Sequence, residues 1–367
     1  MKFIFRTDAS IKIGAGHVMR CLTLAKFLRS KGHHCEFICR DLIGNLSLRI
    51  SKAGFFCHLL IENHEQSYDQ NELSGGYYDW LVASVTLDAS QTIEIVKKDK
   101  IDWLIVDHYS LDDHWETQIK QYVDQIIVID DLANRRHNCD ILLDQTLNRD
   151  ALAYDGLVTQ NVKLLCGSNY VLLRPDFFEL REASLLRRKI PIFKNLLVSL
   201  GGMDENNVTG TVLEILADSS LPQDLKITIL LEETAPWLSS VNNLASSLPW
   251  DIKVLSSVDN VAELMMEADL AIGAGGTSCW ERCSLGLPTI LLVLAENQQE
   301  IARQLLYYGA VFSIDDIKNL DISLTEILSQ IIEKPSLLAD MSKSASSIIV
   351  QNGLCALINE LKEDLNG

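Results

Sequence analysis

The sequence predicts an α/β protein of two domains, each with a parallel β-sheet that helices cover on both faces. Short apolar runs alternate with helical patterns, and nearly continuous apolar strands are typical of parallel sheets. The alternation restarts after Pro191, and 367 residues exceed a typical single domain. The charge balance changes at the same place: residues 1–190 carry 23 Lys and Arg against 26 Asp and Glu, whereas residues 191–367 carry 9 against 24.

The first domain is predicted over residues 1–175. Its strands are short β-branched or aromatic runs that end in a polar or glycine signal. They are predicted at Lys2–Arg6, His34–Cys39, Phe56–Ile61, Trp103–Asp107 and Gln125–Ile129. Helical patterns lie between them at His17–Ser30, Asp88–Lys98 and Asp112–Tyr122.

The second domain is predicted over residues 191–345, after a charged segment, Glu179–Lys189, that we interpret as a helix and a linker. Strands are predicted at Phe193–Leu200, Leu225–Leu231, Asp251–Leu255, Leu270–Gly273 and Thr289–Leu294. Helices are predicted at Asn206–Asp218 and from near Asp259, Thr277 and Asn297. Residues 346–367 are expected to form a C-terminal helix that packs back on the first domain.

The two sheets define where a ligand is expected. Open parallel sheets bind ligands beyond the carboxyl ends of their strands. The loops after Arg6, Asp107, Leu200 and Gly273 are therefore expected to line a cleft, with two Rossmann-like domains facing each other across it.

The composition excludes several functional classes. A net charge of −18 argues against a nucleic-acid partner. Only three consecutive apolar residues precede Arg6, too few for a secretory leader, and no apolar stretch is long enough to span a bilayer. Nine scattered cysteines without a paired CxxC framework indicate reduced thiols in a cytoplasmic protein. No His or Cys cluster has metal-ligand spacing, so no metal ion is expected, and neither a cofactor nor an obligatory protein partner is indicated.

The segment Gly14-Ala15-Gly16-His17 joins the first strand to the first helix. Glycines at such a junction let a ligand approach the backbone, and the positive end of a helix disfavours a protonated imidazole. His17 is therefore a candidate general base, with Asp8 as a carboxylate that could orient its ring. The alternative is a helix cap or a packed surface group. His108, which also ends a predicted strand, is the next candidate.

Two glycine loops in the second domain have the position of a phosphate cradle. Gly201-Gly202 follows one predicted strand, and Gly273-Ala274-Gly275-Gly276-Thr277-Ser278 follows another. Because this half has few lysines, a diphosphate there must depend on amide N–H groups, helix dipoles and hydroxyls. Glu281, about one turn into the next helix, could accept hydrogen bonds from both ribose hydroxyls. The alternative is that these glycines only make tight turns and that Glu281 is a surface charge.

Taken together, the motifs resemble a known family. They are Arg6-x-Asp8-Ala9-Ser10-x-x-Ile13-Gly14-x-Gly16-His17-x-x-Arg20, Val106-Asp107-His108-Tyr109, Asp130-Asp131…His137-x-Cys139-Asp140, Asn169-Tyr170-x-Leu172-Leu173-Arg174, Leu200-Gly201-Gly202-x-Asp204, Gly275-Gly276-Thr277-Ser278-x-x-Glu281 and Glu296-Asn297-Gln298. Their combination, up to about residue 310, resembles the UDP-2,4-diacetamido-2,4,6-trideoxy-β-L-altropyranose hydrolases of pseudaminic acid biosynthesis. Met203 stands where many members have a smaller polar residue.

The resemblance implies a GT-B-like fold and a UDP-sugar hydrolase that uses water as acceptor, needs no metal ion and inverts the anomeric configuration. It implies that His17 activates the water, while Arg6, Asp8, Gly16, Asp107, Tyr109 and Asn297 hold the sugar. UDP is expected on Gly201, Gly202, Gly275, Gly276 and Thr277, with uracil near Ser257 and Val258 and ribose on Glu281. The principal alternative is an inverting GT-B glycosyltransferase that uses the same UDP site. A non-catalytic nucleotide-sugar sensor is disfavoured because both His17 and Asn297 are present.

Overall fold

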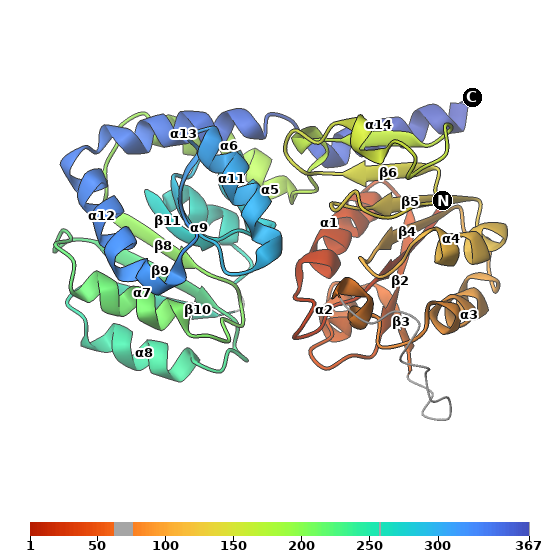
Figure 1. Ribbon diagram of the computed structural model, residues 1–367, viewed down its shortest axis with the longest axis horizontal. Helices are drawn as coiled ribbons and strands as arrows, with labels where there is room; N and C mark the ends of the chain where they lie inside the picture. Colours follow the sequence, from red (N-terminus) through yellow and green to blue (C-terminus); the bar gives the residue numbers. More distant parts are fainter. Residues whose placement is uncertain (62–75, 257, 367) are drawn as a thin grey trace. The chain divides into compact units, whose positions relative to one another are not determined.

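The computed structural model describes residues 1–61, 76–256 and 258–366 (Figure 1). The chain divides into two compact units. Unit 1 comprises Met1–Leu172 and Asn352–Gly367, and unit 2 comprises Leu173–Gln351. Each contains one parallel sheet with helices around it, which confirms the predicted α/β class with two parallel sheets.

The sheet of unit 1 has the strand order β3-β2-β1-β4-β5-β6-β7, and all of its pairs are parallel. Its strands are β1 (Lys2–Thr7), β2 (His34–Arg40), β3 (Phe56–Leu60), β4 (Trp103–Asp107), β5 (Gln125–Ile129), β6 (Ile141–Asp144) and β7 (Lys163–Cys166). Its α-helices are α1 (Gly16–Ser30), α2 (Ser47–Lys52), α3 (Val85–Val96), α4 (Asp113–Ile119) and α14 (Gly353–Asn366).

The central strands of unit 1 are buried on both faces, whereas the edge strands β3 and β7 are partly exposed. Phe3 and Phe5 of β1 pack in one apolar cluster with α1, whereas Ile4 between them packs in the opposite cluster with Trp115 of α4. This alternation follows from the two-residue period of a strand. A sheet buried on both sides accounts for the nearly continuous apolar strands of the sequence.

The last helix, α14, contributes to the core of unit 1 although it is nearly 200 residues away from the rest of that unit in sequence. Leu354, Leu357, Ile358 and Leu361 are buried in the same cluster as Phe3 and Phe5. Gly353 allows this approach, because a Cβ there would lie 2.4 Å from the carbonyl oxygen of Val171.

The sheet of unit 2 has the order β10-β9-β8-β11-β12-β13, also parallel throughout. Its strands are β8 (Asn195–Ser199), β9 (Lys226–Leu231), β10 (Asp251–Ser256), β11 (Leu270–Ala274), β12 (Thr289–Leu292) and β13 (Val311–Ile314). Its α-helices are α5 (Pro175–Glu179), α6 (Arg181–Arg187), α7 (Val208–Ala217), α8 (Leu238–Ser247), α9 (Val261–Glu267), α10 (Ser278–Ser284), α11 (Gln299–Tyr307), α12 (Leu320–Glu333) and α13 (Ser336–Ile348).

Several elements differ from the sequence predictions. Helix α3 begins at Val85 rather than Asp88, because Ser84 caps it by accepting a hydrogen bond from the Leu87 amide at 3.2 Å. Strands β6, β7 and β13 were not predicted. Each is only four residues long, too short for a clear periodic pattern. The predicted strand Thr289–Leu294 ends at Leu292.

Strand register brings the site loops of each unit together. In unit 1, Thr7 pairs with Asp107, so the residues that follow β1 and β4 lie at the same edge of the sheet. In unit 2, Gly273 pairs with Ser199 and Ala274 pairs with Leu292, so three loops meet at the carboxyl edge.

Replacing Leu357 by Ala should lower the free energy of unfolding by about 2–5 kcal/mol, because it removes a fully buried side chain of α14 and leaves a cavity. Urea denaturation monitored by circular dichroism measures the change. Cys355→Ala on the exposed side of the same helix is the matched control and should change the value by less than about 0.5 kcal/mol. Equal effects of the two substitutions would show that α14 does not belong to the core of unit 1.

Candidate functional site

His17, on the first turn of α1, is held by a carboxylate at the end of β4. Its Nδ1 lies 2.6 Å from Oδ1 of Asp107, and the histidine side chain is largely buried. An ionised carboxylate can only accept a hydrogen bond, so Nδ1 carries a hydrogen, and the neutral form of this ring is the tautomer whose lone pair is on Nε2. The prediction that Asp8 orients the ring is wrong, because strand register places Asp107 beside it instead.

Asp107 is kept ionised by Arg20, one helical turn after His17. The guanidinium donates to both carboxylate oxygens, Nε to Oδ2 at 2.6 Å and Nη2 to Oδ1 at 2.7 Å. Burial would raise the pKa of the Asp107 carboxyl, but Arg20 and then His17 lower that pKa well below its usual range. Arg20 also contacts Asp131 at 2.5 Å, which makes it the centre of a chain of ionised groups.

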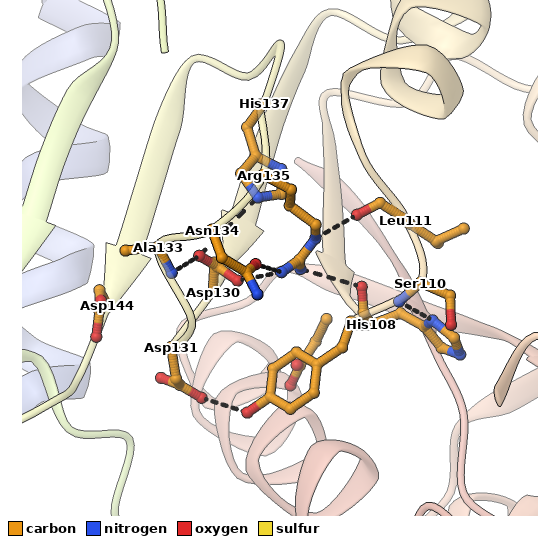
Figure 2. A network of polar contacts seen from close by, with 12 residues as sticks. His108, Ser110, Leu111, Asp130, Asp131, Ala133, Asn134, Arg135, His137 and Asp144 are labelled. Carbon is orange, nitrogen blue, oxygen red and sulfur yellow. Dashed lines mark hydrogen bonds and ion pairs between the residues drawn. The ribbon is translucent and has the colours of Figure 1, made fainter. Parts of the chain in front are cut away.

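Aromatic rings surround the His17 imidazole. The ring of Tyr109 stands perpendicular to it with centroids 4.6 Å apart, and Trp80 contacts it edge-on at 6.0 Å. Tyr77 packs against both aromatic rings. Tyr109 is fixed by a 3.1 Å hydrogen bond from its hydroxyl to Asp131 (Figure 2). Tyr77, Trp80, Arg20 and Asp131 were not among the predicted site residues. Arg20 and Asp131 do lie in motifs that carry the resemblance, whereas Tyr77 and Trp80 lie in none of them.

Arg6 and Asp8 lie beneath this edge rather than on it. Both side chains are fully buried, and the Arg6 guanidinium bonds Asp8 at 2.6 Å and Asp88 of α3 at 2.6 and 3.1 Å. Burial opposes ionisation of Asp8, but Arg6 and His108 lower the pKa of its carboxyl far below the usual range. Neither side chain is exposed in this structure, and the two form an ion pair with each other.

The remaining polar residues at this edge are also bound internally. The buried His108 accepts from the Ser110 amide at 3.1 Å, and burial lowers the pKa of its imidazole. His137 lies 2.7 Å from Glu116. Arg135 pairs with Asp130 at 2.8 Å and donates to the Leu111 carbonyl (Figure 2). His17 differs from His108 and His137 in that part of its side chain, 10%, is exposed, compared with 1% and 0% for the other two.

In unit 2, the loop after β8 is shaped by Gly201, Gly202 and Asp204. Gly201 has a φ of +108°, and a Cβ on Gly202 would lie 2.5 Å from Glu232. Asp204 caps α7 by accepting from the amides of Val208 and Thr209 at 2.9 and 2.8 Å. Because this carboxylate already occupies the start of α7, any anion must be held by the glycine loop rather than by the end of that helix.

The loop after β11 contains Gly275, Gly276 and the exposed Thr277. Gln298 ties this loop to the one after β12, since its Oε1 accepts from the Gly275 amide at 3.3 Å and from the Leu294 amide at 2.9 Å. Asn297, beside Gln298 in a short 3-10 helix, is exposed. Gln298 was not among the predicted site residues, although its motif was recognised.

Glu281 of α10 has an unusual environment for a carboxylate. Burial raises the pKa of the carboxyl to about 7, although Arg174 and Arg282 oppose the shift. Val258, predicted to lie near a uracil, is partly buried after β10, and Ser257 lies outside the described residues. The predicted residues thus form two sets. Unit 1 holds His17, Arg6, Asp8, Gly16, Asp107 and Tyr109, and unit 2 holds Gly201, Gly202, Val258, Gly275, Gly276, Thr277, Glu281 and Asn297.

Two negative findings apply to the part of the chain that the structure describes. In residues 1–61, 76–256 and 258–366, no cluster of three or more His, Cys, Asp or Glu side chains has the arrangement of a metal site. Within those same ranges, no helix has the length and apolar character needed to cross a membrane.

Comparisons with known proteins give consistent results. Residues 197–353 match the family model of the glycosyltransferase family 28 C-terminal domain. The chain is 28% identical over 309 residues to the UDP-2,4-diacetamido-2,4,6-trideoxy-β-L-altropyranose hydrolase of Campylobacter jejuni, covering 84% of this chain and 97% of that protein. It is also 28% identical to an uncharacterised protein of Methanocaldococcus jannaschii, covering 82% of this chain but only 57% of that protein.

Among solved structures, the spinosyn rhamnosyltransferase SpnG complexed with thymidine diphosphate is similar, with a TM-score of 0.68, 14% identity, and coverage of 99% of this chain and 100% of that chain. At that identity the similarity concerns the fold alone. The chain therefore has the GT-B fold that the sequence predicted.

Glu281 should make stability depend on pH. A carboxyl whose pKa is raised to about 7 by folding favours the folded state fully below the pKa of the unfolded chain, near 4.5, and loses that contribution as the pH rises through 7. Glu281→Gln, which stays neutral, should therefore gain roughly 1–3 kcal/mol of unfolding free energy relative to wild type between pH 5 and pH 8.

Urea titrations at the two pH values measure this difference. The exposed Glu233→Gln is the matched control, and its difference from wild type should be the same at both pH values. A pH-independent difference for Glu281→Gln would contradict the assigned environment.

Proposed function

We propose that this protein hydrolyses UDP-2,4-diacetamido-2,4,6-trideoxy-β-L-altropyranose at the anomeric C–O bond, a step of pseudaminic acid biosynthesis. The observation that carries the proposal is the fixed tautomer of His17. Asp107, held by two hydrogen bonds from Arg20, accepts from Nδ1 and leaves Nε2 able to accept a proton. The substrate is suggested by the Campylobacter relative, which the chain matches over nearly its whole length.

In the proposed reaction, a water oxygen attacks C1 of the sugar from the face opposite UDP while His17 Nε2 takes the water proton. The C1–O bond breaks, and its electron pair stays on the β-phosphate oxygen of UDP. The products are UDP and free 2,4-diacetamido-2,4,6-trideoxy-L-altrose with inverted anomeric configuration. Asp107 stays ionised throughout and stabilises the imidazolium that forms.

UDP is proposed to bind unit 2. The amides of the Gly201-Gly202 and Gly275–Thr277 loops would stabilise the charge that develops on the leaving diphosphate, so the proposed step requires no metal ion or other cofactor. Glu281 in its carboxylate form would accept from the ribose hydroxyls, and Val258 would lie near the uracil. The match of residues 197–353 to the family 28 C-terminal domain supports a nucleotide-sugar site in this unit.

The sugar is proposed to meet unit 1 beside Gly16 and against the rings of Tyr77, Trp80 and Tyr109. Apolar ring faces next to the base suit a substrate rich in methyl groups, because a 6-deoxy carbon and two acetamido methyl groups exclude water there. Asn297 would contact the sugar from unit 2. Arg6 and Asp8 would act as positioning residues, since their buried ion pairs support the end of β1.

An inverting glycosyltransferase is the second candidate. The match of residues 197–353 to the glycosyltransferase family 28 C-terminal domain favours it. It would use the same base and the same UDP site, with an alcohol in place of water. Which acceptor the protein uses, water or an alcohol, therefore distinguishes the hydrolase from the glycosyltransferase.

Incubating the protein with the UDP-sugar alone should release UDP and free sugar at equal rates. Proton NMR should show the anomer opposite to that of the substrate appearing first, because a single displacement inverts C1. Matched reactions with and without a panel of alcohol acceptors provide the control. Release of UDP only after an alcohol is added would contradict hydrolysis and support the glycosyltransferase.

Replacing His17 by Asn should lower kcat by about 10²- to 10⁴-fold, the usual contribution of a general base, with UDP affinity within about twofold of wild type. Asp107→Asn should cause a similar loss, because an amide N–H that faces Nδ1 favours the opposite tautomer. Nitrogen NMR of the imidazole reports that tautomer independently of kcat.

The exposed His34→Asn is the control for these variants and should retain wild-type turnover. Turnover that survives in His17→Asn would place the base elsewhere.

A further inference from the structure

Arg282 is a buried cation beneath the loop that follows β11. Its side chain lies on α10 with only 2% of the residue exposed. Nη2 donates to the carbonyl of Ala274 at 2.7 Å, and Nη1 donates to Oγ of Ser278 at 3.0 Å. Nη2 also lies 3.2 Å from the sulfur of Cys279.

The surroundings of this guanidinium differ from those of the buried arginines of unit 1. Arg6, Arg20 and Arg40 each pair with at least one buried aspartate. Among the residues that the structure describes, the partners of Arg282 are a carbonyl, a hydroxyl and a thiol rather than a carboxylate, and its Nε has no hydrogen-bond partner. A buried charge without a counterion is costly, so a compensating partner is expected in the functional state.

The chain makes room for this arginine against the loop. A Cβ on Gly273 would lie 2.6 Å from Nη1 and 2.8 Å from the central carbon of the guanidinium. Gly273 does not have a positive φ, so its backbone does not require glycine. Space for Arg282 is thus a physical reason for glycine at the end of β11.

We propose that Arg282 is a positioning residue for the leaving diphosphate, acting through Ser278. A hydroxyl oxygen that accepts a hydrogen bond from a guanidinium keeps one hydrogen to donate, and the charge-assisted bond polarises that O–H group. The Ser278 hydroxyl is then directed to donate to a diphosphate oxygen, and the anion supplies the counter-charge that Arg282 lacks. This inference rests on the proposed UDP site in unit 2.

A matched set of ligands tests the proposal. Isothermal titration calorimetry with uridine, UMP and UDP measures affinity as phosphate charge increases. Arg282→Met should weaken UDP binding by roughly tenfold or more while changing uridine affinity by less than about twofold, because the lost interaction is directed at the diphosphate. Arg282→Lys keeps the positive charge but not the forked guanidinium geometry, and its UDP affinity should lie between those of Arg282→Met and the wild type.

Arg188 supplies the control for a purely structural role. It is also buried in unit 2, and it donates to the carbonyls of Leu285, Ala268 and Met265. Arg188→Met should lower the melting temperature without changing the ratio of UDP to uridine affinity. Ser278→Ala should reproduce much of the loss of UDP affinity, and the double variant Ser278→Ala/Arg282→Met should be no worse than Arg282→Met alone.

The outcomes are separable. Equal weakening of uridine and UDP by Arg282→Met, or additive losses in the double variant, would overturn the proposal. If Arg282→Met does not fold, Ser278→Ala and Arg282→Lys decide: unchanged UDP-to-uridine ratios in both would overturn it. A wild-type protein that binds UDP no better than uridine would contradict the UDP site itself, and hence the proposed function.

Discussion

The ion pair between Asp107 and Arg20 is the interaction on which the candidate site of unit 1 depends. A carboxylate buried at the end of β4 cannot stay ionised without a counter-charge. Arg20 supplies that charge with two hydrogen bonds and leaves the carboxylate able to orient His17. It also binds Asp131, which in turn holds Tyr109 against the imidazole. One guanidinium therefore fixes the tautomer of the base and the position of the aromatic ring beside it.

The two units manage buried charge differently. Unit 1 pairs its buried arginines with aspartates at the carboxyl edge, as in the cluster of Arg6, Arg40 and Asp88. Unit 2 is strongly acidic, yet Arg282 lies under its glycine loop without a carboxylate contact among the described residues. The ion pairs of unit 1 fix the side chains where the sugar and the water are proposed to bind. Arg282 of unit 2 has no carboxylate contact among the described residues, so its charge can still stabilise an anionic ligand. This contrast agrees with the proposal that the general base lies in unit 1 and that the leaving diphosphate binds to unit 2.

Much of the fold could be predicted from the sequence, because each long apolar strand is bounded by clear polar or glycine signals. Strands β1, β4, β8 and β11 and the loops after them were located in this way. The short strands β6, β7 and β13 were not, since four residues carry too little periodic pattern. The site was predicted in part: His17 and the glycine loops have local motifs, whereas Trp80 and Arg282 approach the site only through tertiary packing.

Local patterns and composition were enough to establish the α/β class, the restart of the pattern after Pro191, the uneven distribution of charge, and the positions of His17 and Glu281 next to glycine loops. These properties depend on neighbouring residues or on composition. Tertiary contacts, by contrast, determine which carboxylate orients His17, bury Arg6 and Asp8, and bring α14 into the core of unit 1. Such contacts join residues about 80 to 350 positions apart, and their geometry follows from strand register and packing, which no local pattern encodes.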